Sequence, residues 1–230
     1  MRIVSWNCNL SLSRKVESLL RLEPDLAVLQ ECEEDLRVPD GYEYVWRGNN
    51  PRKGLGVLSR AHAISVEPSA RSEWAYFLPI TVPTHQLRIL ATWAYNHRAR
   101  RFGGQYVGNP LLVMGELSAW LREGRSIVAG DFNNSVVWDS SGSTVKFADI
   151  DAFLKGLGLT SAYHSLTGEA LGSEKMKTFF HTKKDDRAYH IDYCFVHESL
   201  AVERVRIPAF EEWRSQSDHV PVIVDIANDG

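Results

Sequence analysis

The sequence predicts a mixed α/β layered fold, and two observations carry that prediction. First, apolar runs of strand length recur along the whole chain, and the long stretch of residues 43–95 holds several runs without a helical pattern between them. That spacing argues against a simple doubly wound fold. Second, three other segments repeat their apolar residues with helical periodicity. No linker, low-complexity segment or internal repeat divides the chain, so we expect a single domain over residues 1–230.

The strand predictions follow runs that are rich in apolar and β-branched residues. In chain order they cover residues 2–7, 26–30, 54–58, 74–82, 87–95, 126–129, 190–196, 202–207 and 220–226. Two polar stretches, residues 135–146 and 168–177, are predicted as loops, the second because glycine and serine are spread through it.

The three predicted helices interrupt these strands. Ser13 can cap the first helix, and Asn109 with Pro110 provides a cap and a first-turn proline for the second, which Gly124 ends. The third is predicted over residues 147–157. Each has an apolar stripe on one face. The stripes are Val16, Leu19 and Leu20; Val113, Leu117, Trp120 and Leu121; and Phe147, Ile150, Leu154 and Leu157.

Composition excludes several classes of protein. A hydrophobic content of 44% with 24% charged residues is typical of a globular chain, which excludes disorder and fibrous repeats. The net charge of -3 excludes a protein that holds nucleic acid by bulk charge alone, although it permits a local basic cleft. No window approaches the run of about 18 apolar residues that spans a membrane. We expect a cytoplasmic monomer without stable membrane insertion.

The three cysteines, Cys8, Cys32 and Cys194, form neither an even set nor a pair with metal-ligand spacing. A disulfide framework and a zinc ribbon are therefore not predicted. All three lie in apolar runs, so we expect them to be small buried side chains.

Acid, amide and imidazole side chains end or interrupt five of the apolar runs. They are Asn7, Glu31, Asp131 with Asn133, Asp192, and Asp218 with His219. Because the ends of strands open onto loops, where a rigid sheet presents functional groups, we expect these side chains to share a polar cleft.

These residue types suit the hydrolysis of a phosphate ester. Carboxylates and amides supply the oxygen ligands that Mg²⁺ and Mn²⁺ prefer, and an added imidazole can stabilise a charged transition state. Asp192 stands inside an apolar strand and needs a partner, for which His219 is the candidate. His190 is two residues from Asp192, so it either lines the same surface or packs in the interior.

Five segments, in this order, resemble the endonuclease/exonuclease/phosphatase superfamily, which includes deoxyribonucleases, abasic-site endonucleases, sphingomyelinases and inositol-polyphosphate phosphatases. The segments are Ser-Trp-Asn-Cys-Asn at 5–9, Leu-Gln-Glu at 29–31, Gly-Asp-Phe-Asn at 130–133, Ile-Asp-Tyr at 191–193 and Ser-Asp-His at 217–219. The resemblance implies a four-layer sandwich of two packed mixed β-sheets flanked by helices, with the site at one rim. It also implies a Mg²⁺ or Mn²⁺ cofactor.

The resemblance implies a role for each matching residue. Glu31 would be the principal metal ligand, with Asn7 beside it and Asp218 as a further ligand. Asp131 would orient or deprotonate the attacking water, and Asn133 would position phosphate or nucleophile. His219, paired with Asp192, would contact the phosphate oxygen.

Two departures from the family pattern concern the substrate. The family usually has His or Tyr at the end of a middle strand, where this chain offers Trp93, Tyr95 or His97, and Asn96 is then a phosphate-side amide. We favour Trp93, with Tyr95 as the alternative. His190 replaces an arginine that is common before the Ile-Asp-Tyr segment.

Basic residues supply further candidates for substrate contact. Arg98 and Arg101 follow the strand that ends near Trp93, and either can grip phosphates beside the cleft or simply face solvent. A further pair, Arg52 and Lys53, has no motif context, so a solvated loop is its default interpretation.

Three functions are compatible with these residues. The leading hypothesis is a divalent-metal-dependent phosphodiesterase that acts on DNA or RNA. The alternative is a phosphoesterase for a small molecule or a lipid head group. A binding module with a degenerate site is the third, but it would need a lost acid, and every matching acid is present.

Overall fold

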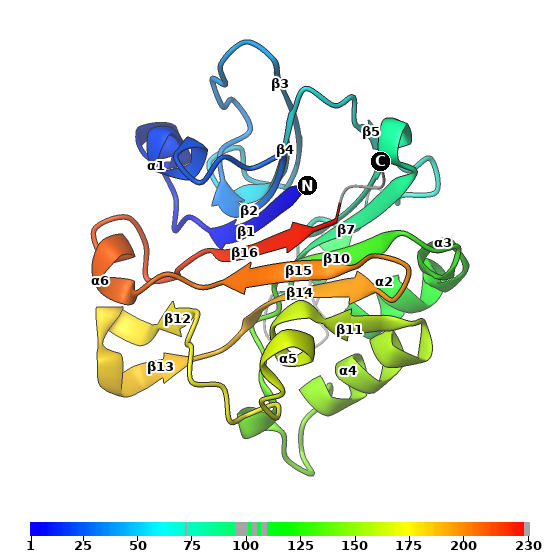
Figure 1. Ribbon diagram of the computed structural model, residues 1–230, viewed down its shortest axis with the longest axis vertical. Helices are drawn as coiled ribbons and strands as arrows, with labels where there is room; N and C mark the ends of the chain where they lie inside the picture. Colours follow the sequence, from blue (N-terminus) through cyan, green and yellow to red (C-terminus); the bar gives the residue numbers. More distant parts are fainter. Residues whose placement is uncertain (72, 95–100, 103–104, 107–109, 228–230) are drawn as a thin grey trace.

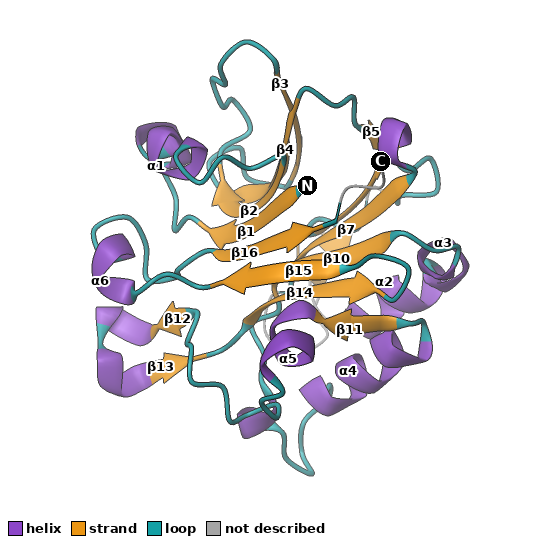
Figure 2. Cartoon of the chain, viewed as in Figure 1, coloured by secondary structure: helices purple, strands orange, loops and turns teal. Residues whose placement is uncertain are grey.

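Two six-stranded β-sheets pack face to face, and helices lie on the outer side of each (Figure 1, Figure 2). The computed structural model describes residues 1–71, 73–94, 101–102, 105–106 and 110–227, with the backbone alone for 101–102 and 105–106. This is the mixed α/β layered fold that the sequence pattern predicts, in the four-layer form that the family resemblance implies. Among the described residues, no helix combines the length and apolar character needed to cross a bilayer.

The first sheet has one parallel pair at its centre. From edge to edge it contains β15 (Val202–Arg206), β16 (Val222–Ile226), β1 (Arg2–Asn7), β2 (Leu26–Cys32), β4 (Gly54–Arg60) and β3 (Tyr42–Arg47). β1 and β2 are parallel, and the other neighbours are antiparallel. The ends of β1 and β2 therefore point toward the same rim of the sandwich.

The second sheet repeats this pattern. Its order is β11 (Leu159–Ser161), β14 (Asp192–His197), β10 (Ser126–Asp131), β7 (Leu87–Trp93), β6 (Phe77–Val82) and β5 (Ser65–Val66). β10 and β7 form its one parallel pair. Two short hairpins lie outside the sheets, β8 (Arg101–Phe102) with β9 (Gln105–Tyr106) and β12 (Phe179–Phe180) with β13 (Ala188–Tyr189).

The apolar side chains of β10 divide between two cores because successive residues of a strand face opposite ways. Ile127 and Ala129 join the core between the two sheets. Val128 joins the second core, where the outer face of this sheet packs against helices. This alternation explains why the central strands read as continuous apolar runs, since both of their faces are buried.

The helices are short. They are α1 (Val16–Leu20), α2 (Pro110–Glu116), α3 (Ser118–Arg122), α4 (Phe147–Gly156), α5 (Ala162–Thr167) and α6 (Phe210–Trp213). The 3₁₀ turns are η1 (Leu12–Arg14), η2 (Pro83–His85), η3 (Val136–Trp138), η4 (His181–Lys183) and η5 (Asp185–Arg187). The prediction over residues 147–157 is confirmed as α4, whereas α5 and α6 are additions.

The first helix does not begin at Ser13 as predicted. Ser13 lies inside η1, and its hydroxyl donates to Glu33 at 3.0 Å instead of capping a helix. The chain enters this turn through three consecutive left-handed residues, and only after Lys15 does α1 begin. The local turn therefore overrides the capping signal in the sequence.

The second predicted helix is split in two. α2 ends at Glu116, Leu117 adopts a ψ of 6°, and α3 resumes at Ser118. Gly124 follows with a φ of +85°, in agreement with the predicted helix end. The predicted cap Asn109 lies outside the described residues.

The predicted strand over residues 74–82 begins later, at Phe77. Trp74 packs in the core beneath the helices, and its backbone forms an isolated β-bridge between turn residues. The predicted loop at residues 135–146 contains the short turn η3.

His190 packs in the interior, which is one of the two alternatives that the sequence left open. Its side chain is buried, and its Nδ1 lies 2.8 Å from the carbonyl oxygen of Met176. The rings of Tyr163, His164 and Tyr193 surround it at centroid distances of 4.9 to 5.7 Å. Burial lowers the pKa of His190 from 6.5 to about 4.

Gly130 lets β10 approach β7 closely. Its φ is +150°, and a Cβ there would lie 1.7 Å from the carbonyl oxygen of Thr92. We expect Gly130→Ala to destabilise the fold by about 3 kcal/mol or more, because backbone must move to relieve this overlap. Gly115 on α2, where a Cβ meets nothing within 4 Å, is the matched control. Urea unfolding measures both, and a small effect at Gly130 would contradict this account.

The buried imidazole of His190 makes stability depend on pH. Because its folded pKa of about 4 lies below the ordinary 6.5, its contribution is complete above pH 6.5 and is lost as the pH falls toward 4. The full loss is about 3 kcal/mol. We expect His190→Phe to flatten the pH dependence of the unfolding free energy in this range, whereas His181→Phe, at an exposed position, keeps the wild-type slope. Equal slopes in the two variants would refute the assignment.

Candidate active site

The ends of central strands bring the predicted polar residues to one rim of the sandwich. Asn7 ends β1, and Asp131 ends β10. Asp192 begins the neighbouring antiparallel strand β14 and pairs in register with Asp131. His219 lies just before β16, which runs antiparallel to β1. Residues far apart in the sequence therefore meet because the sheets align their strands.

Asn7 joins the two sheets through its side chain. Its Nδ2 donates to Asp131 Oδ2 at 3.0 Å and makes a longer contact of 3.4 Å with Glu31 Oε1. Its Oδ1 accepts the backbone N–H of Asn9 at 3.0 Å. All three contacts fix the amide orientation, so Asn7 links carboxylates of both sheets.

Asp131 is a buried carboxylate held by three N–H groups. Asn133 donates its backbone N–H to Oδ1 at 2.8 Å and its side-chain amide to Oδ2 at 3.0 Å, beside the bond from Asn7. Burial and the nearby charge of Asp192 raise the pKa of Asp131 to about 7. Asn133 has a left-handed φ of +46°, which turns the chain so that both of its donors face the carboxylate.

Asp192 and His219 form the buried pair that the sequence predicts. His219 Nδ1 lies 2.9 and 3.2 Å from the two carboxylate oxygens of Asp192. Burial by itself lowers the pKa of the imidazole, but the adjacent Asp192 outweighs it and raises the pKa of His219 to about 9. The imidazole is therefore protonated at neutral pH.

The backbone around this pair is held from several directions. The indole N–H of Trp6 donates to the carbonyl oxygen of His219 at 3.2 Å. Thr178 Oγ1 accepts the N–H groups of Ile191 and Asp192, both at 3.0 Å. The ring of Phe179, at the base of the β12–β13 hairpin, lies 4.6 Å from the His219 ring between centroids. The imidazole is thus positioned by strand, loop and hairpin together.

Glu31 faces a lysine that the sequence analysis did not connect with the site. Lys53 Nζ lies 3.1 Å from Glu31 Oε2 and 5.2 Å from the centroid of the Trp93 ring. Glu31 has a left-handed φ of +58°, at the irregularity where the pairing of β2 with β4 shifts register. The basic pair at 52–53 is visible in the sequence, but nothing local shows that Lys53 reaches Glu31.

Asp218 is held by a second residue beyond the predicted set. Asn9 Nδ2 donates to Asp218 Oδ1 at 2.9 Å. Asn9 belongs to the matching segment at 5–9, and its spacing from Asn7 indicates a shared face, but the sequence does not show that its amide reaches Asp218. Asp218 is half-buried, and its backbone carbonyl accepts the N–H of Phe180 at 2.8 Å.

Two groups of residues at this rim could hold a metal ion. Asp131, Asp192 and His219 offer ligand atoms within 4.8 Å of one another, and they are the one such group among the described His, Cys, Asp and Glu residues. In this group, His219 Nδ1 is already engaged by Asp192. The second group is the predicted one, Glu31 and Asp218. Asn7 contacts Glu31 and Asn9 contacts Asp218, and both acids offer carboxylate oxygens as ligands.

The remaining predicted residues divide between described and undescribed positions. Trp93 is buried beside Tyr76 and Lys53, in register with Asp131. Tyr95, Asn96, His97 and Arg98 lie outside the described residues, as does the side chain of Arg101. His190, predicted as a substrate contact, packs among the rings described above.

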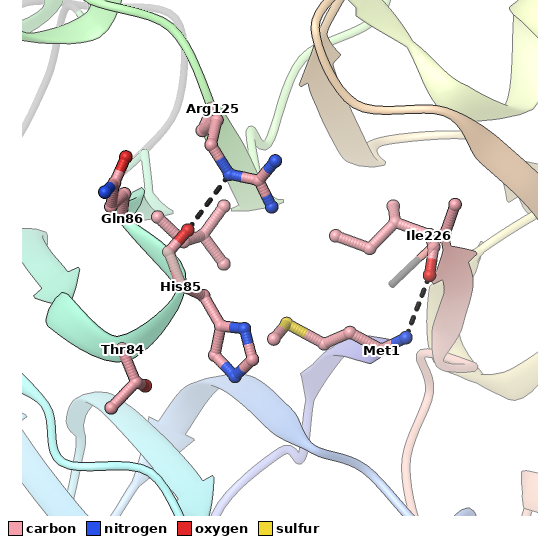
Figure 3. Close-up of a pocket in the computed structure, with 8 residues that line it drawn as sticks. Met1, Thr84, His85, Gln86, Arg125 and Ile226 are labelled. Atoms are coloured by element: carbon pink, nitrogen blue, oxygen red, sulfur yellow. Dashed lines mark hydrogen bonds between the residues drawn. The ribbon is translucent and has the colours of Figure 1, made fainter. Parts of the chain in front are cut away.

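A pocket of about 200 Å³ lies at the opposite rim, where strands β1, β7 and β10 begin and β16 ends (Figure 3). Figure 3 shows Arg125 Nε donating to the carbonyl oxygen of His85 and the Met1 ammonium donating to that of Ile226. None of the predicted site residues lines this pocket. The candidate site is therefore the polar rim.

Comparisons with solved structures show where the same fold occurs. The 3′ phosphatase NExo from Neisseria, bound to a product DNA hairpin, matches with a TM-score of 0.70 and 21% identity over 99% of both chains. The AP endonuclease LMAP from Leishmania major matches with a TM-score of 0.69 and 14% identity, over 100% of this chain and 88% of that one. The APE2 catalytic domain from Xenopus laevis has a TM-score of 0.67 and 17% identity, over 98% and 91%.

A comparison with curated protein sequences gave no match. The family model described as the Endonuclease/Exonuclease/phosphatase family matches residues 4–219, nearly the whole chain, and spans every motif at the polar rim. The order of those motifs, the two-sheet sandwich and the family match agree, and the chain belongs to the endonuclease/exonuclease/phosphatase family.

Proposed function

We propose that this protein is a divalent-metal-dependent phosphodiesterase that hydrolyses phosphodiester bonds of DNA or RNA. One observation carries the proposal. Asp131, Asp192 and His219 bring carboxylate and imidazole atoms within 4.8 Å of one another, and the amides of Asn7 and Asn9 connect this group to Glu31 and Asp218. A base, a cation and metal-ligand oxygens are the groups that phosphoester hydrolysis needs.

The residues fit Mg²⁺ or Mn²⁺. Glu31 and Asp218 would hold the ion with the help of the Asn7 amide, since such hard ions take oxygen ligands. Glu31 already contacts an ammonium group, Lys53, so its environment suits a cation. The bound ion would polarise the phosphate and neutralise charge that develops on it.

Asp131 would orient the attacking water and accept its proton. Its carboxylate is fixed by Asn7 and by both donors of Asn133, which leaves it little freedom to rotate. A pKa of about 7 suits a general base at neutral pH, because the ionised form is populated and the group still binds a proton well.

His219 would contact a phosphate oxygen and stabilise the negative charge of the transition state. Asp192 holds the imidazole through Nδ1 and keeps it protonated, which leaves Nε2 for the substrate. A fixed cation in a buried setting stabilises developing charge more strongly than one in water.

A nucleic-acid substrate is supported by two observations. Neisseria NExo, with the same fold, is described as bound to a DNA hairpin. In addition, the ammonium group of Lys53 stands beside Glu31, where it can contact a phosphate once the carboxylate engages a metal ion.

The substrate class is tested by incubating the purified protein with plasmid, abasic duplex, single-stranded DNA, RNA and a generic bis-phosphodiester. We expect cleavage of at least one nucleic acid with Mg²⁺ or Mn²⁺ and none in EDTA. Activity that survives EDTA would exclude the metal mechanism. Cleavage of the generic ester alone would instead favour a small-molecule or lipid head-group substrate.

Substitution of the proposed base and cation should reduce the rate without unfolding the protein. Asp131→Asn keeps the shape but cannot accept the proton, and His219→Ala removes the charge at the phosphate. Each is expected to lower kcat by about 10²-fold or more. His197→Ala, at the far end of β14, is the matched histidine control. Near-normal turnover in either variant would contradict the role assigned to the residue that it replaces.

Glu31→Gln tests the metal ligand. Loss of the negative charge should weaken the binding of the metal ion. The metal concentration that gives half-maximal activity is therefore expected to rise by about tenfold or more. Glu43→Gln on β3 serves as a control for charge alone. If Glu31→Gln gives the wild-type metal titration, Glu31 is not a ligand.

A further inference from the structure

The ammonium group of Lys15 lies among three backbone carbonyl oxygens just outside the polar rim. Lys15 Nζ is 2.5 Å from the oxygen of Cys8, 2.8 Å from that of Leu10 and 3.4 Å from that of Asn9. The side chain is half-buried. Three carbonyls around one small cation form the kind of oxygen cage that proteins otherwise offer to a metal ion.

The carbonyls converge because the backbone there is unusual. Asn9, Leu10 and Ser11 have φ values of +50°, +66° and +52°, three successive left-handed residues without a glycine. Each such residue costs free energy, and such a run persists only where surrounding contacts hold it. The bonds from Lys15 to the carbonyls of this segment are contacts of that kind.

The same segment carries the link to the metal side of the site. The backbone N–H of Asn9 donates to Asn7 Oδ1, and Asn9 Nδ2 donates to Asp218 Oδ1. Leu10 donates its N–H to the carbonyl oxygen of Glu31 at 3.2 Å. If the left-handed run relaxed, the contacts that it makes with Asn7, Glu31 and Asp218 would all be displaced together.

We propose that Lys15 is a positioning residue whose ammonium acts as a tethered monovalent cation, holding the Asn9 segment so that Asn7, Glu31 and Asp218 are aligned for the divalent ion. This inference rests on the proposed function, because it presumes a metal at those acids. Lys15 contacts backbone oxygens rather than the acids themselves, so it acts through Asn9 and not as a ligand.

The test measures Mn²⁺ binding directly, by the loss of the free-ion electron paramagnetic resonance signal and without substrate. Lys15→Met keeps the apolar stem but removes the ammonium, and we expect the Kd for Mn²⁺ to rise about tenfold, as when a partner of a metal ligand is lost. Lys155→Met on α4, whose ammonium pairs with Asp151 away from the rim, should leave the Kd unchanged.

Chemical rescue separates this role from general destabilisation. Ammonium chloride added to Lys15→Met should lower the Kd toward the wild-type value, because a free ammonium ion can donate to the same three carbonyls. Tetramethylammonium chloride at equal ionic strength has no N–H and should not. Equal effects of the two salts would overturn the proposal.

A double-mutant comparison tests the route through Asn9. Asn9→Ala breaks the bond to Asp218 and leaves the two backbone bonds of the segment, so the combined effect with Lys15→Met on the Kd should be smaller than the sum of the two single effects. Fully additive effects would contradict the inference. If Lys15→Met does not fold, Lys15→Arg takes its place, because a planar guanidinium cannot direct its donors into a cage built for one nitrogen.

The two levels of inference fail in different ways. A wild-type protein that binds no Mn²⁺, or whose binding is unaffected by Glu31→Gln, removes the proposed metal site. A wild-type protein that binds Mn²⁺ through Glu31, with an unchanged Kd in the Lys15 variant, overturns the role of Lys15 alone.

Discussion

The hydrogen bond from the Asn7 amide to the Asp131 carboxylate is the contact on which the rim depends. It joins the end of β1 in one sheet to the end of β10 in the other, and both side chains are buried. A buried polar group without a partner is costly, so the sheets must align well enough to keep this bond. The apolar core between the sheets supplies that alignment, and Asp192 and His219 then complete the network beside it.

Several residues of this rim adopt left-handed backbone conformations although they are not glycine. Asn9, Glu31 and Asn133 all do so, each where a strand has just ended or its pairing shifts. Such residues are strained, and strain of this kind gathers where the surrounding fold holds side chains in a required orientation. The polar groups are thus oriented before any ligand arrives, and the stability of the two cores offsets the local cost.

Short-range patterns in the sequence indicated a layered α/β fold and the polar rim, and the four-layer sandwich followed from the family resemblance. Apolar runs reflect strands buried on both faces, and the motifs around Asn7, Asp131 and Asp218 are contiguous. What the sequence could not indicate depends on how loops and turns fold back on the strands. Lys53 reaches Glu31 from another hairpin, and Lys15 closes a cage on residues five to seven positions earlier. His190 shows the same limit, since strand alternation placed it with Asp192 but the chain before β14 turns its ring into the interior.

The β12–β13 hairpin contacts the polar rim at its base, whereas its tip bonds to Arg214 through Lys183 and Asp185. Thr178 bonds to the backbone of residues 191 and 192, Phe180 bonds to the carbonyl of Asp218, and Phe179 bridges to His219. Its tip, residues 181–187, is exposed throughout. Insertions and changes of charge in that tip can therefore accumulate in evolution without displacing the imidazole, and selectivity for new substrates can be acquired separately from the chemistry of the rim.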